Sequence, residues 1–129
     1  MTFLFKENFN SSGQAESNLK GGSTHSYTES PLTELGRLQA KKLGARLQDE
    51  KFDLVYSSDL SRAYDTCLAI TGDPEAIVKD QLLRGRDFGR FEGQPNSMLD
   101  NAVDKVKEEG MTWLEAFSKV STHARINAW

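Results

Sequence analysis

The chain contains 129 residues, of which 37% are hydrophobic and 27% are charged, and its formal net charge is -3. This length supports one hydrophobic core, so we expect a single domain over residues 1–129, and the acidic balance argues against a nucleic-acid-binding protein, which would carry a basic face. A single cysteine, Cys67, excludes an internal disulfide and a four-cysteine metal site. The lack of a signal peptide or a membrane-spanning apolar run predicts a cytoplasmic protein.

The first third of the chain predicts a short strand, a loop and a helix. Residues 3–5 form the strand, and residues 17–31 are loop-like. Thr33 is expected to cap a helix over residues 34–48. The apolar positions of this helix recur at near-helical spacing and predict an amphipathic helix that covers a sheet: Leu35, Leu38, Leu43 and Leu47.

The middle of the chain alternates between strands and helices. Residues 52–56 predict a buried strand, and Asp59 is expected to cap the helix that follows, in which Cys67 is a small buried residue. The sequence Thr-Gly-Asp-Pro at 71–74 stops this helix, and residues 76–78 supply another strand. This order predicts an α/β fold with a largely parallel sheet and helices on its faces.

Two more helices are expected after a glycine-punctuated loop at residues 84–95. The first of them ends at Gly110 and has its apolar residues at helical spacing: Met98, Leu99, Ala102, Val103 and Val106. The second begins with a capping box formed by Thr112 and Glu115. Its apolar side, which we expect to be core, consists of Trp113, Phe117 and Val120.

The run Val-Tyr-Ser-Ser-Asp-Leu-Ser-Arg-Ala at residues 55–63 has the features of an anion site. An apolar strand ends in hydroxyl groups, and Arg62 stands where a helix begins. Free N–H groups at a helix N-terminus and a planar guanidinium both favour phosphate. A second part of the site lies upstream, in Gly-Gln-Ala-Glu-Ser-Asn at 13–18 and Gly-Gly-Ser at 21–23, ahead of Ser-Pro-Leu-Thr-Glu-Leu-Gly-Arg-Leu-Gln-Ala at 30–40.

Together these segments resemble the histidine phosphatase superfamily, the phosphoglycerate mutase-like proteins, over residues 13 to about 94. The resemblance implies a three-layer α/β/α fold that is truncated at its C-terminus. It assigns phosphate or substrate binding to Arg62 as the phosphate clamp, Asn18 as a hydrogen-bond donor, Gly22 and Ser23 at the pocket edge, and Arg84 and Arg86 as groups that orient an anionic substrate.

The catalytic positions of the family are changed in this chain. Where the family has Arg-His before Gly13, the chain has Ser11 and Ser12, and that histidine is the residue that accepts the phosphoryl group. The place of the family's proton donor holds Gly85, and the family's late histidine has no counterpart before Trp129. The resemblance therefore implies a catalytically impaired family protein that keeps part of a phosphate-binding pocket.

The ligands that the resemblance implies are phosphate and small phosphorylated metabolites such as sugar phosphates. The longer relatives that the chain resembles are the phosphoglycerate mutases and the fructose-2,6-bisphosphatase-like phosphatases. We expect no cofactor, no metal ion, no nucleic acid and no membrane partner.

Two alternatives stay open from the sequence. The chain could be an active phosphatase with a non-standard nucleophile, Ser12 or His25, and with Asp87 or Glu92 in place of the missing acid. It could instead be a truncated or spliced product with little independent function, whose uncovered sheet favours self-association.

Overall fold

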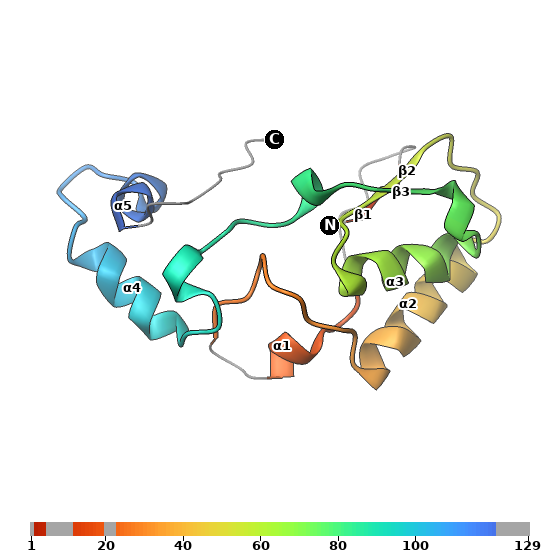
Figure 1. Ribbon diagram of the computed structural model, residues 1–129, viewed down its shortest axis with the longest axis horizontal. Coiled ribbons are helices and arrows are strands. Elements are labelled where there is room, and N and C mark those ends of the chain that lie inside the picture. Colours follow the sequence, from red (N-terminus) through yellow and green to blue (C-terminus); the bar gives the residue numbers. More distant parts are fainter. Residues whose placement is uncertain (1, 5–11, 20–22, 121–129) are drawn as a thin grey trace. The chain divides into compact units, whose positions relative to one another are not determined.

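The computed structural model describes residues 2–4, 12–19 and 23–120, and the chain divides into two compact units (Figure 1). The first unit comprises Met1–Leu19 and Glu29–Arg84, and the second comprises Lys20–Thr28 and Gly85–Trp129. Each unit has its own hydrophobic cluster. The end of the predicted first strand at Phe5 lies outside the described residues. None of the described helices is long and apolar enough to cross a bilayer.

The first unit contains a three-stranded sheet in the order β1 (Thr2–Leu4), β2 (Val55–Ser57) and β3 (Ile77–Lys79). β2 and β3 run parallel, as predicted, because a helix connects them and a helical crossover joins parallel strands. β1 runs antiparallel to β2, which the sequence did not predict. The longer connection from β1 to β2 permits either direction of β1. Because β1 is antiparallel, the sheet is mixed rather than largely parallel.

Helix α3 (Ser61–Thr71) joins β2 to β3 and buries one face in the core of the first unit. Cys67 is fully buried there, between Val55 of β2 and Ile77 of β3. Burial raises the pKa of the Cys67 thiol to about 11, so the prediction of a small core residue is confirmed. The predicted stop is also confirmed, because Gly72 has a φ of 67° and its N–H donates to the carbonyl of Leu68.

Helix α2 (Glu34–Arg46) packs on α3 through its small residues, and Thr33 caps it as predicted by accepting the N–H of Gly36. The buried positions of α2 are Gly36, Ala40 and Gly44. The prediction that its leucines cover a sheet was wrong for Leu35 and Leu38, which are 50% and 49% exposed, whereas Leu47, just after the helix, packs against the core cluster of the sheet.

The reason is the distance between the two helix backbones. A Cβ atom built on Gly44 would lie 2.1 Å from the carbonyl oxygen of Ala69 in α3. Only a face of very small residues allows this approach, and a leucine face does not fit there.

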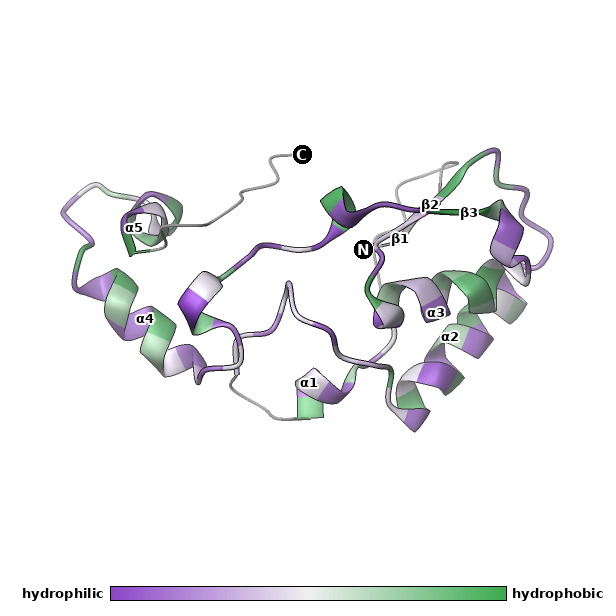
Figure 2. Cartoon of the chain, in the orientation of Figure 1, coloured by the Kyte–Doolittle hydropathy of each residue, from purple (hydrophilic) through white to green (hydrophobic). Residues whose placement is uncertain are grey.

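Short elements complete the first unit. These are α1 (Glu16–Leu19) and the 3-10 turns η1 (Pro74–Ala76) and η2 (Gln81–Leu83). In the part of the chain that the structure describes, β3 is the last strand of the sheet, it is largely hydrophobic (green in Figure 2), and its Val78 is 49% exposed.

The second unit contains η3 (Gly89–Phe91), α4 (Asn96–Asp104) and α5 (Trp113–Val120). Its core consists of Phe91, Leu99, Val103, Ala116 and Phe117. Helix α4 ends at Asp104, before the Gly110 that we predicted as its end, and Gly110 with a φ of 80° lies in the loop that follows.

The predicted capping box of α5 is confirmed. The N–H of Glu115 donates to Thr112 Oγ1 at 3.3 Å, and the N–H of Thr112 donates to Glu115 Oε2 at 2.7 Å. Trp113 stacks on Phe117 with 5.1 Å between ring centroids, so both aromatic residues pack with the core, as expected from the sequence.

The contact of α2 with α3 predicts an unusual effect of Gly44→Ala. In a helix interior this change normally stabilises a protein by about 0.5–1 kcal/mol, because alanine loses less backbone entropy on folding. Here we expect a loss of about 1–3 kcal/mol, because the new methyl group would overlap the Ala69 carbonyl. Chemical denaturation measures the change. Ala45→Gly, at the exposed neighbouring position, is the control for helix propensity, and a Gly44→Ala protein as stable as the wild type would contradict the packing described.

Candidate functional site

The candidate anion site begins where β2 passes into α3. Ser57 and Ser58, the hydroxyl residues at the end of β2, are both fully buried. Ser57 Oγ donates to the carbonyl of Ser58 at 2.9 Å, and Ser58 Oγ accepts the N–H of Leu60 at 3.3 Å. These hydroxyl groups therefore fix the bend between strand and helix, and the bend places Arg62 in the first turn of α3.

Thr66, one turn after Arg62, connects this turn to the segment that contains Ser12. The Thr66 hydroxyl donates to the carbonyl of Arg62 at 2.7 Å and accepts the N–H of Gly13 at 3.2 Å. Thr66 is 1% exposed, whereas Ser12 is exposed. The peptide N–H that follows Ser12, the predicted counterpart of the family's histidine, is thus anchored on the turn that carries Arg62.

Gly13 also lies in backbone contact with α2. A Cβ atom on Gly13 would lie 2.4 Å from the carbonyl oxygen of Gly36, so only glycine fits this position. Sequence analysis did not assign a role to Thr66, although a hydroxyl residue four positions after a helix-start arginine was a visible signal.

Asn18 lies in the same segment, and its side chain caps α1. The N–H of Ala15 donates to Asn18 Oδ1 at 2.7 Å. Because the amide oxygen is used in this way, the amide NH2 group, which carries two donors, is the part of the side chain that suits an anion. The segment is held against residues 30–33 by hydrogen bonds from the N–H of Ser17 to Ser30 Oγ at 2.8 Å and from the N–H of Glu16 to the carbonyl of Pro31 at 2.8 Å.

The carboxylate of Glu29 binds the N-terminus of α3. The N–H of Ser61 lies 3.2 Å from each oxygen of Glu29, the Ser61 hydroxyl donates to Glu29 Oε1, and the N–H of Ser30 donates to the same oxygen at 3.0 Å. Burial raises the pKa of Glu29, but these hydrogen bonds and the charge of Arg62 outweigh it, so that the pKa is lowered overall. A carboxylate of the chain itself therefore occupies the helix end.

Asp59 does not cap α3, so that prediction was wrong. The N-cap residue is Leu60, which makes no side-chain cap. The Asp59 carboxylate instead accepts hydrogen bonds from Arg84. Arg84 Nε donates to Asp59 Oδ1 at 2.7 Å and Arg84 Nη2 donates to Oδ2 at 2.5 Å. These hydrogen bonds lower the pKa of Asp59. Any anionic ligand that Arg84 orients must share this guanidinium with Asp59.

Arg86 contacts aromatic rings of the second unit. Its guanidinium carbon lies 5.4 Å from the ring centroid of Trp113, 5.5 Å from that of Phe117 and 5.9 Å from that of Phe88. Cation–π attraction of this kind stabilises the packing of a guanidinium on the rings. The contacts assign Arg86 a structural role, and its predicted action on a substrate stays a prediction.

Glu92 holds the loop over residues 26–28 in the second unit. Its carboxylate accepts the N–H groups of Ser26 at 3.3 Å, Tyr27 at 3.2 Å and Phe88 at 3.3 Å, and the hydroxyl of Thr28 at 3.1 Å. Both oxygens of the carboxylate act as acceptors. The contacts of Glu92 thus hold this loop, and its predicted part as a replacement for the missing acid stays a prediction.

Gly85, the position that the resemblance assigns to the family's proton donor, is tightly packed. A Cβ atom on Gly85 would lie 2.1 Å from Ser26 Oγ, so an acid at this position would require the Ser26 hydroxyl to turn away. Ser23 pairs with Pro95 in an isolated β-bridge, and His25 Nδ1 lies 3.5 Å from Thr28 Oγ1. The predicted site residues Ser11 and Gly22 lie outside the described residues, as does His123.

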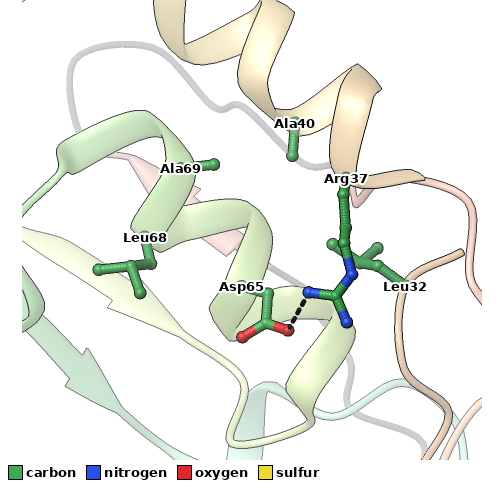
Figure 3. Close-up of a pocket in the computed structure, with 6 residues that line it drawn as sticks. All are labelled: Leu32, Arg37, Ala40, Asp65, Leu68 and Ala69. Carbon is green, nitrogen blue, oxygen red and sulfur yellow. Dashed lines mark ion pairs between the residues drawn. The ribbon is translucent and has the colours of Figure 1, made fainter. Parts of the chain in front are cut away.

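A separate hollow of about 300 Å³ lies between α2 and α3 (Figure 3). Leu32, Ala40, Leu68 and Ala69 line it, together with an ion pair of 3.6 Å between Arg37 Nη1 and Asp65 Oδ2. Figure 3 shows Arg37 reaching towards Asp65 across the hollow. The neutralised arginine and the apolar walls do not suit an anion, and none of the predicted site residues lines this hollow.

Among residues 2–4, 12–19 and 23–120, no group of three or more histidine, cysteine, aspartate or glutamate side chains is placed to hold a metal ion. The functional groups described at the candidate site are guanidinium, amide, hydroxyl and carboxylate groups.

Comparisons with known proteins identify the family and the fold of this chain. The family model described as histidine phosphatase superfamily (branch 1) matches residues 12–125. The chain is 42% identical over 87 residues to a 2,3-bisphosphoglycerate-dependent phosphoglycerate mutase of Brucella ovis, a match that covers 63% of this chain and 42% of that protein.

Solved structures show the same fold. A phosphoglycerate mutase from Bacillus anthracis matches with a TM-score of 0.66 and 31% identity, over 74% of this chain and 43% of that one. A phosphoserine phosphatase from Entamoeba histolytica, in complex with 3-phosphoglyceric acid, matches with a TM-score of 0.61 and 32% identity, over 69% and 44%. The predicted phosphoglycerate mutase-like α/β fold is confirmed, and the chain spans less than half the length of these relatives.

The two hydrogen bonds of Thr66 predict that Thr66→Val destabilises the protein by about 1–3 kcal/mol. Valine keeps the shape but leaves the N–H of Gly13 without its acceptor. Thermal or chemical denaturation measures the loss. Thr71→Val is the matched control, because Thr71 also donates to the carbonyl four residues before it but accepts its N–H bond from Asp73, two residues away, and not from a distant segment. Equal losses in the two variants would show that the contact with Gly13 contributes nothing.

Proposed function

The chain belongs to the histidine phosphatase superfamily, and from this membership we propose that it binds phosphate groups through Arg62 without transferring them. The ligand class is small phosphorylated metabolites, including sugar phosphates. The family's nucleophile position is Ser12, and its proton-donor position is Gly85.

The observation that carries the proposal is the pair of hydrogen bonds made by Thr66. They hold the N–H of Gly13 and the carbonyl of Arg62 on one hydroxyl group. In a phosphoryl-transfer site the nucleophile and the phosphate clamp must lie side by side. The segment that begins with Ser12 and the turn that carries Arg62 share the Thr66 hydroxyl, which supports the proposal, and the nucleophile position carries a serine.

A serine hydroxyl is a poor replacement for the imidazole. Imidazole can attack phosphorus as a neutral base near pH 7, whereas a hydroxyl group must first lose its proton to an activating partner. Loss of the nucleophile together with its acid removes several orders of magnitude from the rate. Phosphate binding requires neither residue, because it depends on the guanidinium, the Asn18 amide and nearby N–H groups.

The ligand class follows from the relatives. The Brucella ovis protein is a phosphoglycerate mutase, and the Entamoeba histolytica phosphatase was solved with 3-phosphoglyceric acid. We extend the shared chemistry of these ligands, a phosphate ester on a small polar molecule, to this chain.

Inorganic phosphate is expected to stabilise the wild-type protein, and Arg62→Met is expected to abolish this stabilisation. At a phosphate concentration ten times a Kd on the order of 1 mM, binding adds about 1.4 kcal/mol to the free energy of unfolding. Thermal denaturation with and without phosphate, at constant ionic strength, measures the shift. Arg46→Met, at the exposed last turn of α2, is the control for loss of positive charge.

Hydrolysis of p-nitrophenyl phosphate is the companion measurement, and no turnover above the uncatalysed rate is expected. A melting temperature that does not respond to phosphate would contradict the binding proposal. Turnover that disappears in Ser12→Ala or His25→Ala would instead establish the alternative of a non-standard nucleophile.

Self-association through the sheet is a second proposal, carried by the exposed Val78 on β3. We expect the wild-type chain to form dimers or larger species at high concentration, and Val78→Lys to shift it towards the monomer, because a charge on the strand opposes strand pairing. Light scattering after gel filtration measures the mass. Glu75→Lys, just before the strand, controls for added charge, and a wild-type protein that is monomeric throughout would contradict the proposal.

A further inference from the structure

The first turn of α3 carries a negative charge where the proposed function places a phosphate. Glu29 accepts the N–H of Ser61 at 3.2 Å and also the Ser61 hydroxyl, and its carboxylate is close enough to Arg62 for that charge to act on it. An N–H at a helix start, a hydroxyl group and a guanidinium are also what a phosphate oxygen requires. The carboxylate and a phosphate therefore use the same kinds of donor at the same turn.

The residue next to Glu29 in sequence contacts the segment that carries Asn18, the second predicted phosphate ligand. Ser30, its neighbour in sequence, accepts the N–H of Ser17 at 2.8 Å, and Ser17 precedes Asn18. On its other side Glu29 contacts Ser61, which precedes Arg62. The contacts thus place this carboxylate between the segment that carries Asn18 and the helix turn that carries Arg62.

The other acid at this end of α3 is already matched by a positive charge. Asp59 forms a bidentate ion pair with Arg84, so the two charges offset each other locally. Glu29 has hydrogen-bond donors from Ser61 and Ser30, which are neutral groups. Glu29 is therefore a negative charge at this end of α3 that is close enough to interact with Arg62.

From these contacts we infer that Glu29 is a built-in competitor of phosphate, which occupies the N-terminus of α3 and weakens phosphate binding at Arg62. This inference rests on the proposed function, since it concerns the affinity of the Arg62 site. The residue is exposed, so its side chain can swing aside when a phosphate enters. Its negative charge, which opposes a phosphate anion nearby, is what sets the affinity.

Glu29→Gln tests the inference on the full chain. Glutamine keeps an oxygen that accepts the N–H of Ser61 but removes the charge. Two unit charges a few ångströms apart near a protein surface repel strongly enough that we expect inorganic phosphate to bind about three- to tenfold more tightly to this variant. Isothermal titration with inorganic phosphate at constant ionic strength measures the Kd. Glu34→Gln, an exposed acid in the first turn of α2, is the matched control and is expected to leave the Kd unchanged.

A second variant separates competition from simple capping. Glu29→Ala removes the cap together with the charge, so it lowers the melting temperature, yet competition predicts that it too binds phosphate more tightly. If Glu29 only holds the helix end in shape, Glu29→Gln leaves the Kd unchanged and Glu29→Ala weakens binding. Either of these results would overturn the inference while leaving the Arg62 site intact.

Failure of the proposed function gives a different pattern. If the wild type binds phosphate and Arg62→Met binds it equally well, the Arg62 site is wrong and the proposed function fails. The double variant with Glu29→Gln and Arg62→Met tests whether Glu29 acts on the Arg62 site. Competition at Arg62 predicts that the tighter phosphate binding caused by Glu29→Gln disappears in the double variant. If neither the wild type nor Glu29→Gln binds phosphate, both the site and the competition are refuted.

Discussion

The structure of the candidate site depends on how the first turn of α3 is held. Its inner side is fixed by Thr66, whose buried hydroxyl joins Gly13 to the carbonyl of Arg62. Its outer end is fixed by the carboxylate of Glu29, which binds Ser61. Both contacts are made by polar groups with matched donors and acceptors, which for the buried Thr66 is the condition for placing a polar group inside a protein. Arg62 thus stands on a backbone that is fixed before any ligand binds.

Each predicted arginine already has a partner or neighbour within the chain. Arg84 is paired with Asp59, Arg86 lies over the rings of the second unit, and Arg62 has Glu29 nearby. A run of arginines in the sequence therefore does not produce an open field of positive charge. In the first unit, a carboxylate and an arginine of the chain already stabilise each other. An anionic ligand would therefore have to replace existing contacts.

Local signals predicted several helix ends, although not the start of α3 or the end of α4, and distant contacts were not predictable. Thr33, Gly72 and the pair Thr112 and Glu115 act on residues within four positions, so their roles can be seen in the sequence. The contact of Thr66 with Gly13 spans 53 positions and that of Glu29 with Ser61 spans 32, so no local pattern indicated either.

The buried face of α2 was mispredicted for a related reason. The prediction from leucine spacing assumed that large side chains fill the interface of α2. At Gly44 the backbones of α2 and α3 approach so closely that only small residues fit. Asp59 shows the same limit, because the acid nearest to a helix start was drawn to an arginine 25 positions away. For the fold, the α/β alternation was enough to identify the class, whereas the direction of β1 was left undetermined by its long connection.

Glu92 shows that the architecture of a loop and the chemistry of a reaction can be inherited separately. Its carboxylate accepts N–H groups from two segments that are far apart in the sequence, Ser26 with Tyr27 and Phe88. The shape of this loop thus depends on Glu92 and needs no acid at position 85. An acidic residue beside a candidate site can therefore serve the scaffold, so its presence alone does not identify a proton donor.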